Sequence, residues 1–223
     1  MKRSVYLTYP LALDGPRPPA IPAPELTEFL HIITDMASVQ KLSLYSHVGS
    51  HLDTAAHVIE GGRHITDFSP EELVFYRPTV IDIRVPDDTV LMPNDFAPLI
   101  SEIKETDFLI LRLGLGMVRK NEKERYAKHS PGLSLEAGCF LVESLKNLRG
   151  IGLDGPSLAC IARLDETMKV HNTMLSAHNG SFIVIEEMNL EYDLTGLCCL
   201  TVNPWLVEGM HSGPCSVIGY FSV

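Results

Sequence analysis

The stretch that decides the fold and the site reads His47-Val48-Gly49-Ser50-His51-Leu52-Asp53-Thr54-Ala55-Ala56-His57. Its three histidines and its aspartate all occupy odd positions, and side chains two residues apart share one face of an extended strand. A helix would not group them, because at about 3.6 residues per turn Asp53 falls nearly opposite His51. The pattern therefore predicts the end of a strand, bent at Gly49, that directs imidazoles and a carboxylate into one pocket.

Imidazole nitrogens and carboxylate oxygens are the ligands of Zn, Mn or Fe in proteins. A fully extended strand would separate His47 from His57 by roughly 33 Å, at about 3.3 Å per residue, which is too far for one ion. The chain must therefore curl after Asp53, and residues 54–59 can begin a helical turn. This geometry favours His47, His51 and Asp53 as metal ligands and His57 as a nearby acid or base. The competing interpretation is a set of ordinary histidines on a half-exposed strand.

The same run resembles the signature His-x-Gly-Thr-His-x-Asp-x-Pro-x-His of the cyclase-like metal hydrolases, a family that includes bacterial kynurenine formamidase and isatin hydrolase. It departs from that signature where Ser50 replaces threonine and Ala55 replaces proline. Serine keeps the hydroxyl group, and the loss of proline removes a rigid φ angle but no ligand. Weaker matches follow in the family's order within residues 7–11, 129–137, 151–157, 170–186 and 213–214.

The resemblance implies that a histidine and a glutamate from the second half of the chain complete the metal site. Some members of the family hold two ions bridged by the aspartate. His171 and Glu186 occupy the corresponding places, with His178 and Glu187 as rival ligands because the interval between the two positions looks longer here. The cofactor would be one or two divalent ions, Zn²⁺ or Mn²⁺, since imidazoles with carboxylates suit both almost equally.

Short apolar runs predict strands at residues 41–45, 79–84, 107–113, 150–153, 182–185 and 197–202, and helical patterns at 96–105 and 133–148 separate several of them. This alternation predicts a mixed α/β fold. A chain of 223 residues is most simply one domain, 1–223. The resemblance implies more specifically a swivelling β/β/α domain with a mixed, barrel-like central sheet, assembled as a homodimer or homotetramer.

A proline-rich segment from Pro10 to Pro24 predicts a loop or an extended arm. Such an arm could cover the pocket or reach a neighbouring subunit, and a plain surface loop is an equal alternative. The acidic residues that follow Pro24 predict the start of a helix over residues 24–30.

The composition excludes several classes of protein. A hydrophobic content of 45% with 21% charged residues is typical of a soluble globular protein. A net charge of −10 argues against nucleic acid or an anionic membrane as the main partner, since both attract clustered Lys and Arg. The N-terminus lacks the long apolar core of a signal peptide or a membrane span. Five scattered cysteines predict reduced, mostly buried thiols and a cytoplasmic location.

Three further side chains have two interpretations each. Asp154 follows a predicted buried strand and either orients a ligand histidine or closes a turn. Tyr126 and Trp205 could line a pocket for an aromatic ring, although core packing is the more common role of such residues.

The function predicted from the residues and the resemblance together is metal-dependent hydrolysis of a small amide, either an aryl formamide like N-formylkynurenine or a cyclic amide. Metal-activated water would attack the carbonyl group, and His57 would protonate the departing nitrogen. The alternatives are a metal-dependent cyclase or dehydratase, a small-molecule binding protein that contains a metal, and a purely structural metal site.

Overall fold

The central element of the fold is a nine-stranded mixed sheet. The computed structural model describes residues 3–222, so the first two residues and the last residue of the predicted domain 1–223 lie outside the described residues. The strand order of the sheet is β5-β12-β13-β4-β11-β10-β8-β6, and β1 pairs with β13. The strands β6, β8, β10 and β11 are mutually parallel, whereas β4 is antiparallel to both of its neighbours. Because β12 also lies beside β6, the sheet nearly closes into a barrel. The predicted mixed α/β fold with a barrel-like sheet is confirmed.

The strands are β1 Arg3–Tyr6, β2 Glu25–Leu30, β3 Val39–Ser43, β4 His51–Asp53, β5 Val74–Phe75, β6 Pro78–Asp82, β7 Val90–Leu91, β8 Phe108–Arg112, β9 Gly132–Leu133, β10 Gly150–Leu153, β11 Ile183–Glu186, β12 Leu197–Pro204 and β13 Ser212–Phe221. The α-helices are α1 Ile32–Asp35, α2 Pro93–Phe96, α3 Ile100–Ile103, α4 Gly116–Asn121, α5 Lys123–His129, α6 Leu135–Ser144, α7 Leu164–Leu175 and α8 Ala177–Gly180. The 3₁₀ helices are η1 Ala55–His57, η2 Ile65–Asp67, η3 Pro70–Leu73, η4 Ala97–Leu99 and η5 Ile161–Arg163.

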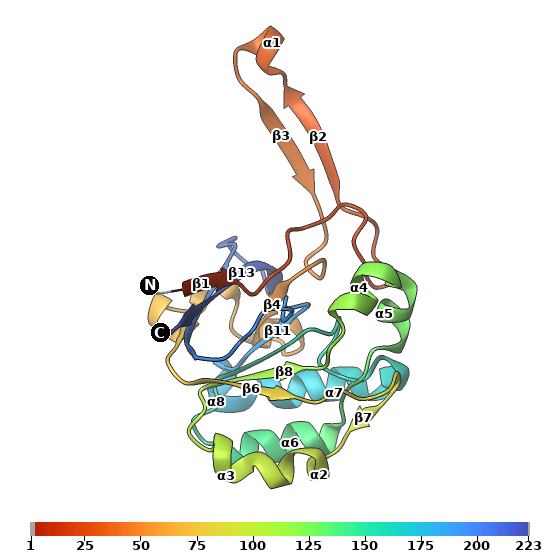
Figure 1. The fold of residues 1–223 in the computed structure, drawn as a ribbon. Coiled ribbons are helices and arrows are strands. Elements are labelled where there is room, and N and C mark those ends of the chain that lie inside the picture. The colour runs from red at the N-terminus through yellow and green to blue at the C-terminus, as the bar shows by residue number, and fades with distance from the viewer. Residues whose placement is uncertain (1–2, 223) are drawn as a thin grey trace.

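Two hydrophobic cores lie on the two faces of the parallel strands, and the alternation of side chains along each strand serves both. In β8, Leu109 and Leu111 face the core shared with α6 and α7, while Phe108 and Ile110 face the core inside the barrel. Burial on both faces explains why these strands read as continuous apolar runs in the sequence. Figure 1 shows α6 and α7 covering the outer face of the sheet, opposite β4.

The predicted core strands and the long helix lie close to their expected places. Ser134 caps α6 by accepting a hydrogen bond from the backbone N–H of Ala137. The helix expected at residues 96–105 is instead three short helical segments, α2, η4 and α3, because Pro98 in η4 cannot donate the hydrogen bond that a continuous helix requires.

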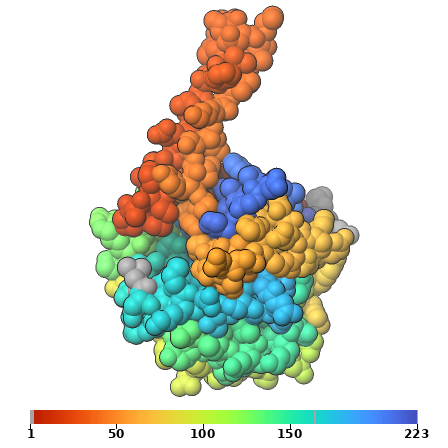
Figure 2. Space-filling view, turned by 180° about the vertical axis from the view of Figure 1, so that it is seen from behind, coloured from red at the N-terminus to blue at the C-terminus, as the bar shows by residue number. Residues whose placement is uncertain are grey.

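The helix predicted at residues 24–30 is wrong, because residues 25–30 form strand β2. This strand pairs with β3 from Glu25 opposite Ser43 to Leu30 opposite Val39, and helix α1 closes the hairpin. The pairing also explains why the predicted strand at 41–45 lies outside the central sheet. We call residues 25–43 the hairpin arm, which stands away from the body in Figures 1 and 2.

The proline-rich segment before the hairpin arm runs along the body as an irregular chain. Lys123 at the start of α5 anchors it by donating to the backbone oxygen and the carboxylate of Asp14, both at 2.7 Å. Within the described residues, no helix has the length and apolarity needed to span a membrane.

All five cysteines, which lie within the described residues, have free thiols. Cys160 and Cys215 are buried, but Cys198 is exposed and two more are half-buried, so the expectation of mostly buried thiols is wrong.

Candidate metal centre

Strand β4 brings the first part of the site into the middle of the sheet, between β11 and β13. It spans only His51–Asp53, shorter than the predicted strand, and Leu52 between them enters the barrel core. Since β4 is antiparallel to β11, His51 lies directly opposite Glu186. The register therefore places Glu186, from the second half of the chain, beside His51, from the first half.

The remaining parts come from irregular segments and a helix. His47 precedes Gly49, whose φ of +69° turns the chain into β4 as predicted. The curl expected after Asp53 is the 3₁₀ helix η1, which carries His57. His171 lies in α7, which packs against β11.

Four contacts hold five of the predicted residues in one cluster. The Nδ1 atom of His47 lies 3.3 Å from Oδ1 of Asp53, and Nε2 of His51 lies 3.8 Å from the same oxygen. Glu186 places its Oε2 atom 3.2 Å from Nε2 of His51 and its Oε1 atom 3.0 Å from Nε2 of His171. These separations are close to the roughly 3.4 Å between ligand atoms that share one tetrahedral ion with bonds of about 2.0–2.1 Å.

Backbone carbonyl groups orient two of the imidazoles. The Nδ1 atom of His51 lies 2.8 Å from the oxygen of Gly49, and Nδ1 of His171 lies 2.8 Å from the oxygen of Thr167. When Nδ1–H donates to a carbonyl, the lone pair resides on Nε2, and in both residues Nε2 points into the cluster. Histidines that bind metals commonly use this arrangement.

Buried polar atoms without partners mark the centre of the cluster. Although the N···O contacts of the cluster are short, Nε2 of His51 and both carboxylate oxygens of Asp53 make no geometrically acceptable hydrogen bond among the described residues, and both side chains are buried. An unpaired buried carboxylate is strongly unfavourable unless a cation or a donor compensates it. The donors thus fit a divalent ion, and Asp53 belongs to two possible ligand groups, His47/His51/Asp53 and Asp53/His171/Glu186, each with its ligand atoms within 4.8 Å of one another.

Electrostatics at the cluster also favour a cation. Burial acts to lower the pKa of the two histidines, but the carboxylates of Asp53 and Glu186 raise that of His51 to about 10 and that of His171 to about 9. Burial acts to raise the pKa of the carboxylates, but the imidazoles lower both, that of Glu186 to about 2. Both carboxylates therefore stay ionised, and protons on His51 and His171 balance their charge until a divalent ion displaces those protons.

His57 lies beside the cluster but has a different environment. Its half-buried ring lies with its centroid 4.5 Å from that of His47 and 6.0 Å from that of His171. Burial lowers the pKa of His57 to about 4, with His47 and His171 adding to the shift against the opposing charge of Asp53. The imidazole is therefore neutral near pH 7. A cleft of about 490 Å³ reaches it, lined by residues of η1, α6 and α7.

The rival ligands lie elsewhere. The Nε2 atom of His178 lies 2.7 Å from the backbone oxygen of Leu148. Glu187 has a φ of +54°, which turns its side chain away from Glu186 and toward Arg119, whose Nε donates to it at 2.9 Å. Neither residue belongs to a possible ligand group among the described residues.

The structure decides between the two interpretations of Asp154, Tyr126 and Trp205. The carboxylate of Asp154 accepts from the backbone N–H groups of Leu113, Gly114 and Leu115, so it closes the turn after β8 and does not orient a ligand histidine. Tyr126 is a core residue. Trp205 is 46% exposed and lines a second cleft, of about 410 Å³, with Tyr6, Tyr9 and Tyr192.

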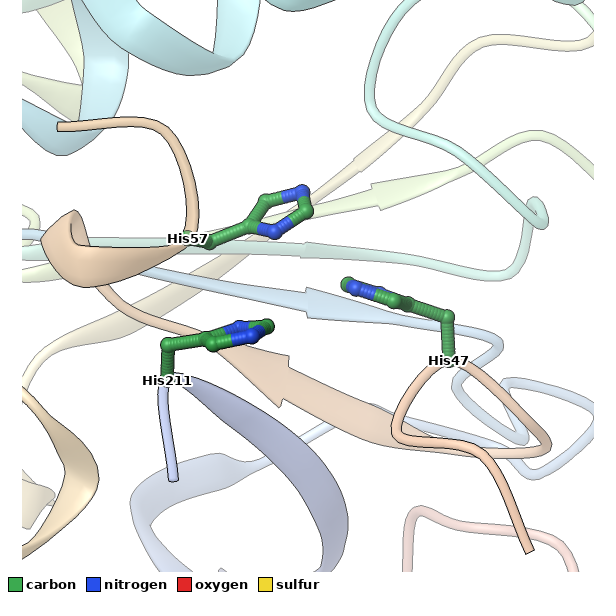
Figure 3. Close-up of side chains that lie close together, drawn as sticks. All are labelled: His47, His57 and His211. Atoms are coloured by element: carbon green, nitrogen blue, oxygen red, sulfur yellow. The ribbon is translucent and has the colours of Figure 1, made fainter. Parts of the chain in front are cut away.

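Sequence reasoning missed His211. It lies immediately before β13, where Ser212 pairs with Asp53, so the strand register carries it to the site. Its ring centroid lies 5.7 Å from that of His57 and 6.4 Å from that of His47 (Figure 3). No local motif marks it, because its ring neighbours His57 and His47 lie 154 and 164 residues away in the sequence.

Comparisons with known proteins agree with this architecture. A family model described as "Putative cyclase" matches residues 5–159. Isatin hydrolase A from Labrenzia aggregata, bound to benzyl benzoate, has a TM-score of 0.84 at 22% identity, covering 100% of this chain and 94% of that one. A potential metal-dependent hydrolase with cyclase activity has a TM-score of 0.73 at 21% identity, with 100% of both chains covered. An uncharacterized protein of Haemophilus influenzae is 24% identical over 110 residues, which are 48% of this chain and 76% of that one.

Proposed function

From the premise that this chain belongs to the Cyclase family, whose model matches most of its length, we propose that it is a metal-dependent hydrolase of small amides. The observation that carries the proposal is that both buried oxygens of Asp53, a member of two groups of possible ligands, make no hydrogen bond among the described residues. A neutral histidine and an open cleft adjoin this centre. The similarity in fold to isatin hydrolase A supports the same chemistry.

The residues that would hold the metal are those predicted from the sequence. His47, His51 and Asp53 would hold one ion, and Asp53, His171 and Glu186 would hold it or a second one. When bound there, Zn²⁺ or Mn²⁺ polarises a carbonyl group and lowers the pKa of water from about 15.7 toward about 7.

His57 would move the proton during the reaction. Because its imidazole is neutral near pH 7, it accepts a proton from the attacking water and then donates it to the departing nitrogen of the amide. This agrees with the sequence-based expectation of His57 as a nearby acid or base and adds proton uptake from water to the predicted protonation of the departing nitrogen. General acid–base help of this kind contributes roughly 10²- to 10⁴-fold to the rate.

The cleft beside His57 suits a small substrate with an apolar part. Val58, Leu135 and Met168 provide apolar surface, and Lys169 and Asn172 provide polar groups that can orient a carbonyl or a carboxylate. We propose an aryl formamide, such as an N-formylkynurenine-like compound, or a cyclic amide as the substrate class.

The free thiols support the predicted location in the cytoplasm.

Metal content is the decisive test of this function. We expect protein purified without added metal to contain one or two equivalents of Zn or Mn by mass spectrometry, and Asp53→Asn and His171→Ala to contain less. His178→Ala is the matched control and should retain the metal, since Nε2 of this histidine lies 2.7 Å from the backbone oxygen of Leu148, outside the cluster. A wild type that binds no metal even after soaking would refute the proposal.

A second function deserves a parallel assay because the family and one solved structure carry the word cyclase. A cyclase or dehydratase would use the same centre to close a ring or to expel water. Product analysis separates the two reactions, because hydrolysis adds one water molecule to the substrate and dehydration removes one.

We also propose that the protein is a homo-oligomer joined through the hairpin arm. Among the described strands, β2 and β3 pair only with each other. The arm exposes seven large apolar side chains, with exposed fractions from 37% to 93%: Leu26, Phe29, Ile32, Ile33, Met36, Val39 and Leu42. An isolated two-stranded hairpin is marginally stable in water, so these side chains require a partner.

A second copy is the occupant that fits, because each chain carries both an apolar arm and an open aromatic cleft near Trp205 and Tyr6. Such self-complementarity is the requirement of a twofold interface. The mass measured by light scattering should fall from that of an oligomer to that of a monomer in the double variant Phe29→Ser, Ile33→Ser. Tyr76→Ser, which removes a 70% exposed side chain outside the arm, should not change it. A monomeric wild type would refute the interface.

A further inference from the structure

Three histidines from three separate segments converge at the solvent side of the candidate metal centre. His47 comes from the bend before β4, His57 from η1 and His211 from the start of β13, and Figure 3 shows the rings lying close together. Each offers a ring nitrogen, and these nitrogens lie within 4.8 Å of one another. His211 has no role in the proposed hydrolysis, so its position requires a separate explanation.

The position of His211 is fixed by the same backbone that carries the hydrolytic residues. Its carbonyl oxygen accepts hydrogen bonds from the backbone N–H of Thr54 at 3.1 Å and from the Thr54 hydroxyl at 2.8 Å. Thr54 links Asp53 to η1, which carries His57. The Nδ1 atom of His211 lies 3.1 Å from the Ser212 hydroxyl, which leaves Nε2 as the free ligand atom. Its ring also stacks on that of His57 at an interplanar angle of 23°.

We propose that His47, His57 and His211 form a further binding site for a transition-metal ion, which shares His47 with the His47/His51/Asp53 group of the principal site. Ligand nitrogens on one tetrahedral ion lie roughly 3.4 Å apart, so rotations that close the present separations, all within 4.8 Å, by up to about 1.4 Å complete the site. His211 is exposed and the other two rings are half-buried, so these rotations meet little packing resistance.

The chemistry of the three ligands selects the ion. A site of imidazoles without a carboxylate favours Zn²⁺, Cu²⁺ or Ni²⁺, whereas Mg²⁺ and Ca²⁺ prefer oxygen ligands. The ligand groups around Asp53 contain carboxylate oxygen and suit Mn²⁺ as well as Zn²⁺. The two kinds of site therefore differ in which ions they accept.

Occupancy of this three-histidine site has a consequence for turnover. The ion binds the His57 nitrogen that moves the proton, and on His47 it uses the ring nitrogen other than Nδ1, which faces Asp53 in the principal site. Zn²⁺ in excess over the resident metal therefore inhibits the enzyme. This consequence, unlike the site itself, rests on the proposed hydrolase function.

The binding test counts metal on protein that retains its resident ions. After dialysis against micromolar free Zn²⁺, wild type should contain one equivalent more than His211→Ala, and its affinity for that equivalent should be at least about tenfold higher. His129→Ala removes an exposed histidine of α5 that belongs to none of the possible ligand groups, and it should bind as wild type does. His211→Gln, which keeps the size of the side chain, should behave as His211→Ala.

Two results would overturn the proposal. Equal zinc content in wild type and His211→Ala would show that His211 binds no ion, and loss of the resident metal in His211→Ala would assign His211 to the principal site. If an amide is turned over, His211→Ala should need at least about tenfold more Zn²⁺ for the same inhibition. Zinc counting does not depend on turnover, so it tests the site even if the hydrolase assignment fails.

Discussion

Replacement of Asp154 by alanine should lower the free energy of unfolding by about 4 kcal/mol and leave the metal content unchanged. The Asp154 carboxylate accepts from the N–H groups of Leu113 at 2.7 Å and of Gly114 and Leu115 at 2.9 Å. Leu113 and Leu115 are buried, so their N–H groups would lose the acceptor that they have among residues 3–222, at about 2 kcal/mol each. Gly114 is exposed, and water can replace the carboxylate there.

The asparagine variant provides the matched control, because the two oxygens of Asp154 have unequal loads. Oδ1 serves Leu113 alone, whereas Oδ2 serves both Gly114 and Leu115. In Asp154→Asn, an amide oxygen in the Oδ2 position keeps two of the three hydrogen bonds, so this variant should lose about half as much stability, or about 2 kcal/mol.

Urea unfolding with a common m-value measures both losses, and thermal unfolding should show a decrease of about 8 to 16 °C for Asp154→Ala in a chain of this size. A loss below about 1 kcal/mol in the alanine variant, or equal losses in both variants, would refute the hydrogen-bond count. Loss of metal from a stably folded Asp154→Asn would instead return this residue to the role of orienting a ligand histidine.

Three further changes test the site and its surroundings. His57→Ala should retain the metal and lose about 10²- to 10⁴-fold in turnover of an amide, and full activity would dismiss His57 as the group that moves the proton. Gly49→Ala should lower the free energy of unfolding by about 1 to 3 kcal/mol, because φ is +69° there and the added Cβ would lie 3.1 Å from Cδ1 of Leu11; thermal unfolding measures this, and an unchanged melting temperature would contradict it. The hydrogen bond and charge of Arg63 lower the pKa of Glu72 to about 2, so this ion pair stabilises the fold above the ordinary pKa of 4.5 and ceases to do so as the pH falls toward 2. Glu72→Gln should therefore cost under about 1 kcal/mol at pH 7 for this partly exposed pair, with a smaller difference near pH 3 by urea unfolding, and a difference that grows on acidification would be the contrary result.

Local patterns in the sequence predicted the parts of the fold that depend on local physics. The core strands were visible because strands buried on both faces must be apolar throughout, and α6 was visible because Ser134 supplies its cap. The helix expected at residues 24–30 failed because it rested on acidic residues after a proline. The pairing of β2 with β3 supplies interstrand hydrogen bonds that outweigh this weak preference.

The histidine run also predicted half of the candidate site, since period-two spacing is a property of the chain itself. His47, His51 and Asp53 lie within a few residues of one another, and the curl that carries His57 follows from the reach of a strand. The family resemblance supplied His171 and Glu186, which local geometry alone could not have selected over His178 and Glu187.

The tertiary structure alone decided how the two halves of the chain meet. The antiparallel register of β4 with β11 sets Glu186 opposite His51, and its register with β13 brings His211 beside His57. Strand pairing between distant segments depends on the packing of the whole sheet, which no window of sequence contains. The order of residues along the chain sets which ligand side chains are available, and strand pairing sets which of them lie together.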